Sequence, residues 1–168
     1  MSISDLLFKY ILGKKNFKIL ILYGSQTGNV EAISKILFNK INLQEKEILE
    51  MNKITEIKQL ENYDYIFFLV STTGDGEFPE NSEKFWKIIR KYQEPLDIRY
   101  SLIGFGDSNY RSFCHTSKCL SRKLKKLHAE EIFPLLQIDD ALDHTPKIDK
   151  WIEDVCLFLQ EKDNEMKN

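Results

Sequence analysis

The sequence of 168 residues predicts an α/β fold, in which a parallel β-sheet carries helices on both faces. Two observations predict it. Short, nearly continuous apolar runs, typical of strands that are covered on both faces, occupy residues 18–23, 64–70 and 100–105. Segments with apolar residues at helical spacing lie between and after these runs, as expected for repeated strand–helix units.

Four amphipathic helices and two weaker strands complete the predicted elements. Residues 47–51 and 132–138 are the weaker strands, and Pro134 favours an edge position for the second, because proline cannot donate to a ladder. Each helix has one apolar stripe that is expected to face the sheet. The stripes are Val30, Ile33, Ile36 and Leu37; Phe85, Trp86, Ile88 and Ile89; Cys119, Leu120, Leu124 and Leu127; and Ile148, Trp151, Ile152, Val155 and Leu159.

The chain length suits one domain with a sizeable core. We expect a helical extension at residues 1–16, a domain at 17–160, and a charged tail at 161–168 that frays. The apolar cluster at 6–12 is too short to cross a bilayer, and no other stretch is long enough, so we expect no membrane association.

Composition excludes several classes of function. Lys and Arg number 24 and Asp and Glu 26, a net charge of −2, whereas a protein that binds duplex nucleic acid normally carries a basic excess. Cys114, Cys119 and Cys156 form no CxxC pair and are expected to be reduced thiols of a cytoplasmic protein. The three histidines have no metal-ligand spacing, so no metal site is predicted.

Ligands of parallel α/β sheets lie beyond the carboxyl ends of the strands, so the loops after residues 23, 70 and 105 are the candidates. The first loop, GSQTGNVE at 24–31, joins two hydroxyls and two glycines to the N–H groups of a helix start, an arrangement that binds anions. It lacks the lysine of a Walker loop, which favours a phosphate monoester over a nucleoside triphosphate. The alternative is that Ser25 and Thr27 only cap the helix.

Together with Tyr23, this loop reads YGSQTGNVE and resembles the phosphate loop of the flavodoxin family, whose ligand is flavin mononucleotide (FMN). The second loop, STTGDGEFPEN at 71–81, and the third, GFGDSNYRSFC at 104–114, resemble those of the FMN domains of diflavin reductases of the methionine synthase reductase and sulfite reductase type. The resemblance covers about residues 17–158.

The resemblance implies a flavodoxin-like fold with a five-stranded sheet of order 2-1-3-4-5 and a site for FMN. It implies that residues 25–29 wrap the phosphate, that the Gly74 peptide bonds the flavin N5 and favours a neutral semiquinone, and that Tyr110 stacks on the ring. The cofactor-binding residues expected from it are Ser25, Gln26, Thr27, Gly28, Asn29, Val30, Ser71, Thr72, Thr73, Gly74, Asp75, Gly76, Gly104, Phe105, Gly106, Asp107, Asn109, Tyr110, Phe113 and Asp139.

The sequence departs from the family pattern at one position. Many diflavin FMN domains have an aromatic residue where Thr73 stands, so that the ring lies between two aromatics. Here Phe78 is the candidate substitute, and the departure bears on the affinity for FMN and on its potentials.

Acidic residues follow several strands and are expected to form a rim around the cofactor. The rim comprises Asp75, Glu77, Glu80, Asp107 and Asp140. Carboxylates oppose the addition of negative charge to a flavin, and they attract a basic partner surface at low salt. The alternative is an ordinary solvated face.

These features predict an electron-transfer flavoprotein that takes single electrons from an FAD/NADPH reductase and gives them to a haem, iron–sulfur or cobalamin protein. Two alternatives stay open: an FMN module of a larger diflavin reductase, and an interaction module without redox turnover. A phosphorelay receiver has the same architecture but needs an aspartate where the third strand ends in Ser71, Thr72 and Thr73. We therefore set the receiver aside.

Overall fold

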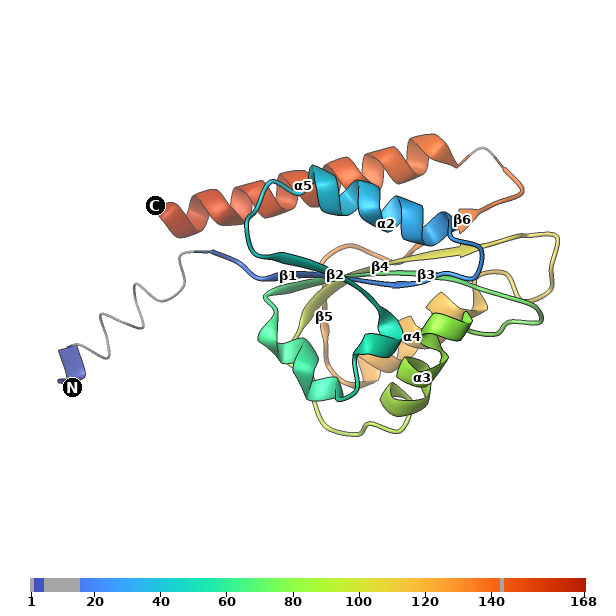
Figure 1. Ribbon diagram of the computed structural model, residues 1–168, viewed down its shortest axis with the longest axis horizontal. Helices are drawn as coiled ribbons and strands as arrows, with labels where there is room; N and C mark the ends of the chain where they lie inside the picture. Colours follow the sequence, from blue (N-terminus) through green and yellow to red (C-terminus); the bar gives the residue numbers. More distant parts are fainter. Residues whose placement is uncertain (1, 5–15, 143) are drawn as a thin grey trace.

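A parallel sheet lies at the centre of the computed structural model, which describes residues 2–4, 16–142 and 144–168 (Figure 1). Its strands run in the order β2-β1-β3-β4. Beyond β4, the edge of the sheet consists of two short strands, of which β5 pairs with the start of β4 and β6 pairs with its end. This is the predicted order 2-1-3-4-5 with the fifth strand divided. The strands are β1 Ile19–Gly24, β2 Lys46–Glu50, β3 Tyr65–Ser71, β4 Arg99–Gly106, β5 Glu130–Glu131 and β6 Leu136–Asp139.

The fifth strand differs from the single run predicted at 132–138. β5 pairs with Arg99 and Tyr100 at the start of β4, and β6 pairs with residues 103–106 at its end. The chain leaves the ladder between them, where Pro134 has no N–H to donate. β6 still reaches the carboxyl edge of the sheet, so the loop that follows it joins the other three loops there.

Helices cover both faces of the sheet. The helix α2 (Asn29–Lys40) and the long α5 (Thr145–Lys167) lie on one face, while α3 (Glu80–Ile89) and α4 (His115–Lys126) lie on the other, with the 3₁₀ helices η1 (Met51–Lys53) and η2 (Ile57–Asn62) (Figure 1). Side chains of β1 alternate between the two layers: Ile19 and Ile21 join the cluster beneath α2 and α5, whereas Leu20 and Leu22 join the cluster beneath α3 and α4. Burial on both faces explains the uninterrupted apolar run.

The carboxyl-terminal segment 161–168, for which we expect fraying, is helical in the structure, because α5 continues to Lys167. Asp163, which is only 4% exposed, pairs with Lys167 at 2.8 Å between Nζ and Oδ2, and Gln160 donates to Asn164 at 3.1 Å. Such pairs four residues apart extend a helix beyond its apolar stripe. The helical extension expected at 1–16 lies mostly outside the described residues. Within the described ranges, no helix has the length and apolar character needed to span a membrane.

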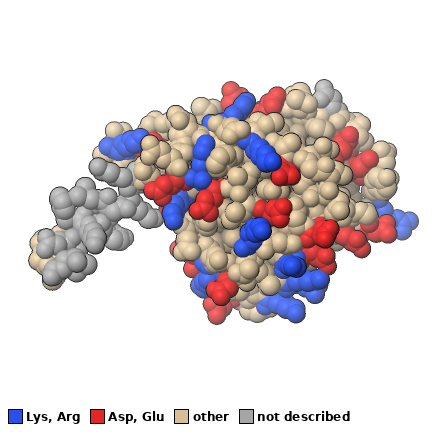
Figure 2. Space-filling model, viewed as in Figure 1, with Lys and Arg blue, Asp and Glu red and all other residues tan. Residues whose placement is uncertain are grey.

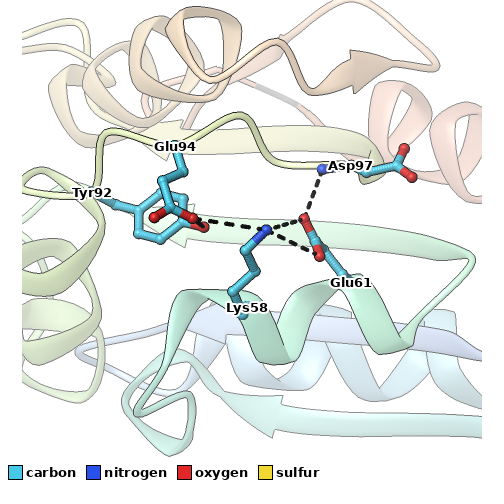
Figure 3. A network of polar contacts seen from close by, with 5 residues as sticks. All are labelled: Lys58, Glu61, Tyr92, Glu94 and Asp97. Carbon is cyan, nitrogen blue, oxygen red and sulfur yellow. Dashed lines mark hydrogen bonds and ion pairs between the residues drawn. The ribbon is translucent and has the colours of Figure 1, made fainter.

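A polar network joins η2 to the loop before β4, at the amino ends of the strands (Figure 3). Glu61 Oε1 accepts from the backbone N–H of Asp97 at 3.1 Å and from Lys58 Nζ at 3.2 Å, and Glu94 lies 4.0 Å from the same ammonium. Glu61 raises the pKa of Lys58. This exposed network connects elements at the edge of the sheet opposite the candidate loops.

Candidate functional site

The carboxyl ends of β1, β3, β4 and β6 bring their four loops together. The N–H of Thr72 donates to the carbonyl of Phe105 at 3.0 Å, and the N–H of Asp140 donates to the carbonyl of Gly106 at 2.7 Å. These bonds extend the parallel ladders past the ends of the strands. Residues far apart in the sequence therefore form one edge.

The N-terminus of α2 is open toward this edge. Gly28 is its N-cap with a φ of 92°, and no side chain among the described residues accepts a hydrogen bond from the first turn. Ser25 Oγ accepts instead from the N–H of Gly28 at 3.1 Å, and Thr27 has no hydrogen bond to a described residue. Ser25 and Thr27 therefore do not cap the helix in this structure, contrary to that alternative. The free N–H groups of the first turn are available to an anion.

Side chains near α3 fix the shape of this first loop. Asn81 Oδ1 accepts from the N–H of Ser25 at 2.9 Å, and Gln26 Oε1 accepts from the N–H of Glu80 at 3.2 Å. Gln26, expected to wrap a phosphate, therefore uses its carbonyl oxygen to hold the loop on α3. The loop is preorganised by the opposite helical layer.

Glu31 is the acidic residue in the first turn of α2, where a negative charge competes with a bound anion. It pairs with Lys35 at 3.1 Å and accepts from the Tyr23 hydroxyl at 3.2 Å. Lys35 lowers the pKa of Glu31. Burial and the neighbouring Glu31 raise the pKa of Tyr23 to about 12, so the phenol stays a donor. Both contacts occupy this carboxylate, and the Lys35 ammonium offsets its negative charge.

Two cavities open at the same edge. The first, of about 280 Å³, lies between the loops after β3 and β4 and is lined by Thr72, Gly74, Gly106, Asp107, Tyr110, Ser112 and Asp140. The second, of about 390 Å³, lies beside α2 and is lined by Thr27, Asn29, Val30, Ala32, Ile33, Ser71, Phe105, Asp140 and His144. We call them the loop cavity and the α2 cavity. Asp140 lines both, so they adjoin.

The wall of the loop cavity is a closed turn. Thr73 and Glu77 exchange two backbone hydrogen bonds, of 2.8 and 2.7 Å. Gly74 and Gly76 take positive φ values of 49° and 106° within it. Thr72 Oγ1 lies 2.9 Å from the hydroxyl of Thr116 at the start of α4, which anchors the turn.

Phe78 does not take the place that an aromatic at Thr73 would fill. Its ring stacks on Trp86 of α3, with centroids 4.8 Å apart and an angle of 11° between the planes. Phe78 lines a different cavity, between α3 and α4. The suggestion that Phe78 substitutes for the missing aromatic is therefore wrong for this structure. Tyr110, with 66% of its surface exposed, is the aromatic that lines the loop cavity.

Sequence reasoning missed the position of Asp140 at the junction of the cavities, and it missed His144 altogether. The two side chains lie 3.5 Å apart between Oδ1 and Nε2, and the buried His144 Nδ1 has no hydrogen-bond partner among the residues that the structure describes. Partial burial raises the pKa of Asp140, the nearby Asp107 and Asp139 add to the rise, and His144 opposes it. The spacing of four residues between Asp140 and His144, just before α5, is the sequence feature that could have indicated this pair.

Several predicted residues shape the loops through hydrogen bonds to the backbone. Asp139 Oδ1 accepts from the N–H groups of Ser108 and Ala141 at 3.0 Å each, and bonds from Ser108 lower its pKa. Asp107 Oδ1 accepts from the N–H of Asn109 at 2.8 Å. Ser25, Gln26, Gly28, Thr73, Asp75, Gly76, Gly104, Asn109, Phe113 and Asp139 line neither the loop cavity nor the α2 cavity.

Acidic side chains gather at the end of the molecule where these loops lie, on the right of Figure 2. Asp75, Glu77 and Glu80 are exposed there, and none of them has an ion pair with a described residue. Asp107 and Asp140 line the loop cavity behind them. The expected rim thus exists as a concentration of carboxylates beside the cavities.

Comparison with known proteins agrees with this geometry. The family model described as flavodoxin matches residues 21–151. The chain is 32% identical over 151 residues to the mitochondrial NADP(+) pyruvate dehydrogenase of Euglena gracilis, covering 86% of this chain and 8% of that protein. It is 33% identical over 145 residues to the NADPH sulfite reductase flavoprotein alpha-component of a Shewanella species, covering 84% of this chain and 24% of that protein.

The fold also matches solved structures. A flavodoxin from Streptococcus pneumoniae superposes with a TM-score of 0.67 at 23% identity, covering 80% of this chain and 94% of that one. The fold is thus that of a whole flavodoxin. By contrast, the chain spans less than a quarter of the length of the two curated relatives.

Proposed function

This chain belongs to the flavodoxin family, which makes FMN its cofactor, and we propose that it carries single electrons from an FAD/NADPH reductase to a protein acceptor. One observation carries the proposal. The open N-terminus of α2 and the cavity lined by Tyr110 lie at one edge of the sheet, and Asp140 lines the cavities at both. This edge can therefore accommodate a phosphate at one end and a planar ring at the other.

The residues present fit the phosphate end of FMN. The N–H groups at the start of α2 donate to the phosphate, and the free Thr27 hydroxyl and the Asn29 side chain add donors at the α2 cavity. The helix dipole favours the negative charge in the absence of a lysine. Asn81, Gln26 and Ser25 hold the loop in this shape before the ligand arrives.

The residues of the loop cavity fit the ring end. Tyr110 offers an aromatic face, and the backbone of the Gly74 turn offers peptide groups at the cavity wall. With Thr73 where many relatives have an aromatic, the ring is stacked on one side and less covered on the other. When bound, FMN supplies a ring that accepts electrons one at a time. The protein's own groups orient that ring and leave an edge accessible to partners.

The acidic rim supports the electron-transfer role and the docking of redox partners. Carboxylates close to a flavin oppose further negative charge on the ring, which favours electron donation. The exposed Asp75, Glu77 and Glu80, with Asp107 and Asp140 behind them, provide a surface for a basic acceptor. Cys114, Cys119 and Cys156 are free thiols, which supports a reducing cytoplasmic setting.

An FMN module of a larger diflavin reductase is the second candidate function. The chain spans 24% of the Shewanella flavoprotein, whose name marks it as part of a sulfite reductase. Both candidates use the same cofactor site and the same rim. They differ in whether the reductase is a separate protein or part of the same polypeptide.

Thr27→Val tests the cofactor site on which the proposal depends. Loss of one hydroxyl donor to a charged phosphate costs about 1.5–3 kcal/mol, so we expect affinity for FMN to fall about 10- to 150-fold. Affinity for riboflavin, which has no phosphate, stays unchanged. Quenching of flavin fluorescence measures both, and Thr55→Val, an exposed threonine outside the four loops, is the control. Equal losses for the two flavins would contradict a phosphate contact at Thr27.

A further inference from the structure

A cavity outside the cofactor region lies between α3, α4 and the turn after β3. Its volume is about 340 Å³, and its lining includes Cys119 and His115 from α4, Arg90 at the C-cap of α3, and the stacked Phe78 and Trp86. We call it the α3–α4 cavity. It brings a thiol, an imidazole and a guanidinium to one concave surface.

Cys119 differs from the other two thiols in its contacts. Its Sγ lies 3.4 Å from His115 Nε2 and 3.5 Å from Arg122 Nη2, and it is partly exposed to the cavity. Cys114 is fully buried, its Sγ donates to the carbonyl of Ile138, and burial raises its pKa to about 12. Cys156 is partly exposed like Cys119, but its sulfur has no hydrogen bond with a described residue. Cys156 is therefore a control within the same chain.

The groups around Cys119 suit a reactive thiolate. His115 Nε2 is placed to take the thiol proton, and the Arg122 guanidinium faces the sulfur that becomes negative. Arg122 has no ion pair with a described residue, so its charge is available to the sulfur. Nucleophile, base and cation thus lie on one face of α4.

The wall of the cavity in front of the thiol carries charges of both signs. Glu83 and Lys87 in its wall pair with each other at 2.7 Å. Arg90 and Glu77, also in the wall, have no ion pair with a residue in the described ranges, so one positive and one negative charge face the space next to Cys119. A small disulfide that carries both carboxylate and ammonium groups matches these charges, and the flat face of Phe78 and Trp86 offers it apolar contact.

We propose that Cys119 is a thiol–disulfide exchange site for a small zwitterionic disulfide of the glutathione disulfide class, which carries both carboxylate and ammonium groups. His115 takes the proton of Cys119, and the thiolate attacks one sulfur of the reagent. A new disulfide forms at Cys119 as the S–S bond of the reagent breaks, and the departing thiolate takes the proton from His115. Cys119 is oxidised from thiol to disulfide, and one half of the reagent is reduced to a thiol.

The test exposes the full folded chain to glutathione disulfide near neutral pH and follows intact mass and peptide mapping over time. We expect one glutathionyl group per chain, located on Cys119, formed several-fold faster than at Cys156 and removed by dithiothreitol. Modification of Cys156 at the same rate as Cys119 would overturn the proposal, as would a folded chain that stays unmodified.

Variants then distinguish an effect of the cavity residues on the exchange rate from an effect of solvent exposure of the thiol alone. His115→Gln slows exchange at Cys119 with every disulfide. Arg90→Gln slows exchange several-fold with glutathione disulfide but not with the neutral hydroxyethyl disulfide, whereas Lys126→Gln, an exposed charge on α4, alters neither rate. Unchanged melting temperatures show that each variant is folded. Equal effects of Arg90→Gln and Lys126→Gln would show that the cavity does not select the reagent.

Discussion

In the proposed cofactor site, individual residues at the edge of the sheet have separable roles. The donors at the start of α2 are proposed to hold the phosphate end, and Tyr110 the ring end. The motifs in the sequence indicated the open start of α2 and the cavity lined by Tyr110. They did not predict Asp140 at the junction or His144 beside it, because these positions depend on where β6 ends and α5 begins rather than on a local pattern.

Tyr110→Ala removes the aromatic face of the loop cavity. An aromatic pair contributes about 0.5–1.5 kcal/mol beyond burial, so we expect affinity for FMN and for riboflavin to fall together, about 3- to 10-fold. We also expect the potential for full reduction to become less negative, because the electron-rich reduced ring loses an unfavourable π neighbour. Potentiometric titration measures this, with Tyr110→Phe as the control. A potential equal to that of the wild type would argue against stacking.

Asp139→Asn tests the electrostatics of the frame through pH. The pKa of Asp139 is lowered in the folded chain, mainly by the Ser108 hydroxyl, so its ionised form stabilises the fold above its unfolded pKa. That contribution is lost as pH falls through the lowered folded pKa. We therefore expect the variant to be less stable than the wild type at about pH 7, and the gap to close as the pH falls through the lowered folded pKa of Asp139. Urea unfolding at several pH values measures it, and a gap that does not change with pH would contradict this account.

At the scale of elements, buried runs were the most predictable part of the fold. β1, β3 and β4 follow the apolar runs closely, because burial on both faces leaves little room for polar residues. The edge was less predictable: β5 and β6 divide the expected fifth strand, and α5 extends past its apolar stripe through polar pairs. The short helix η2 has too few residues for a periodic signal. Tertiary contacts, rather than local sequence patterns, determine where these elements begin and end.

The packing of α4 on β4 requires a glycine at 104. A Cβ there would overlap both Oγ and Cβ of Ser117. Gly104→Ala therefore forces α4 away from β4, and we expect a loss of about 1–3 kcal/mol in the free energy of unfolding. Urea denaturation of Gly104→Ala and of the double variant Gly104→Ala/Ser117→Gly measures the effect. The double variant recovers part of the stability; no recovery would show that another contact causes the loss.

At the scale of the whole molecule, a near-neutral chain has an uneven charge distribution. The net charge of −2 hides the acidic rim beside the cofactor edge (Figure 2). The rim was predictable because acidic residues follow several strands whose carboxyl ends share one edge. Its partners depend on proteins outside this chain.

Electron transfer to a basic haem protein such as cytochrome c tests the rim. We expect the rate to fall as ionic strength rises from about 0.01 to about 0.15 M, because salt screens the attraction. Replacing Asp75 with Asn, and Glu77 and Glu80 with Gln, lowers the rate at low salt and weakens its dependence on salt. The matched control neutralises the exposed Asp149, Glu153 and Glu161 of α5. Equal effects of the two variants on stopped-flow rates would show that total charge, and not the rim, attracts the partner.

The most direct test of the central claim is titration of the purified chain with FMN, followed by stepwise reduction under absorbance. The account predicts that one FMN binds per chain, more tightly than riboflavin, and that the bound flavin is reduced in two separate one-electron stages. A folded chain that takes up no FMN, or that binds FMN no better than riboflavin, would contradict it.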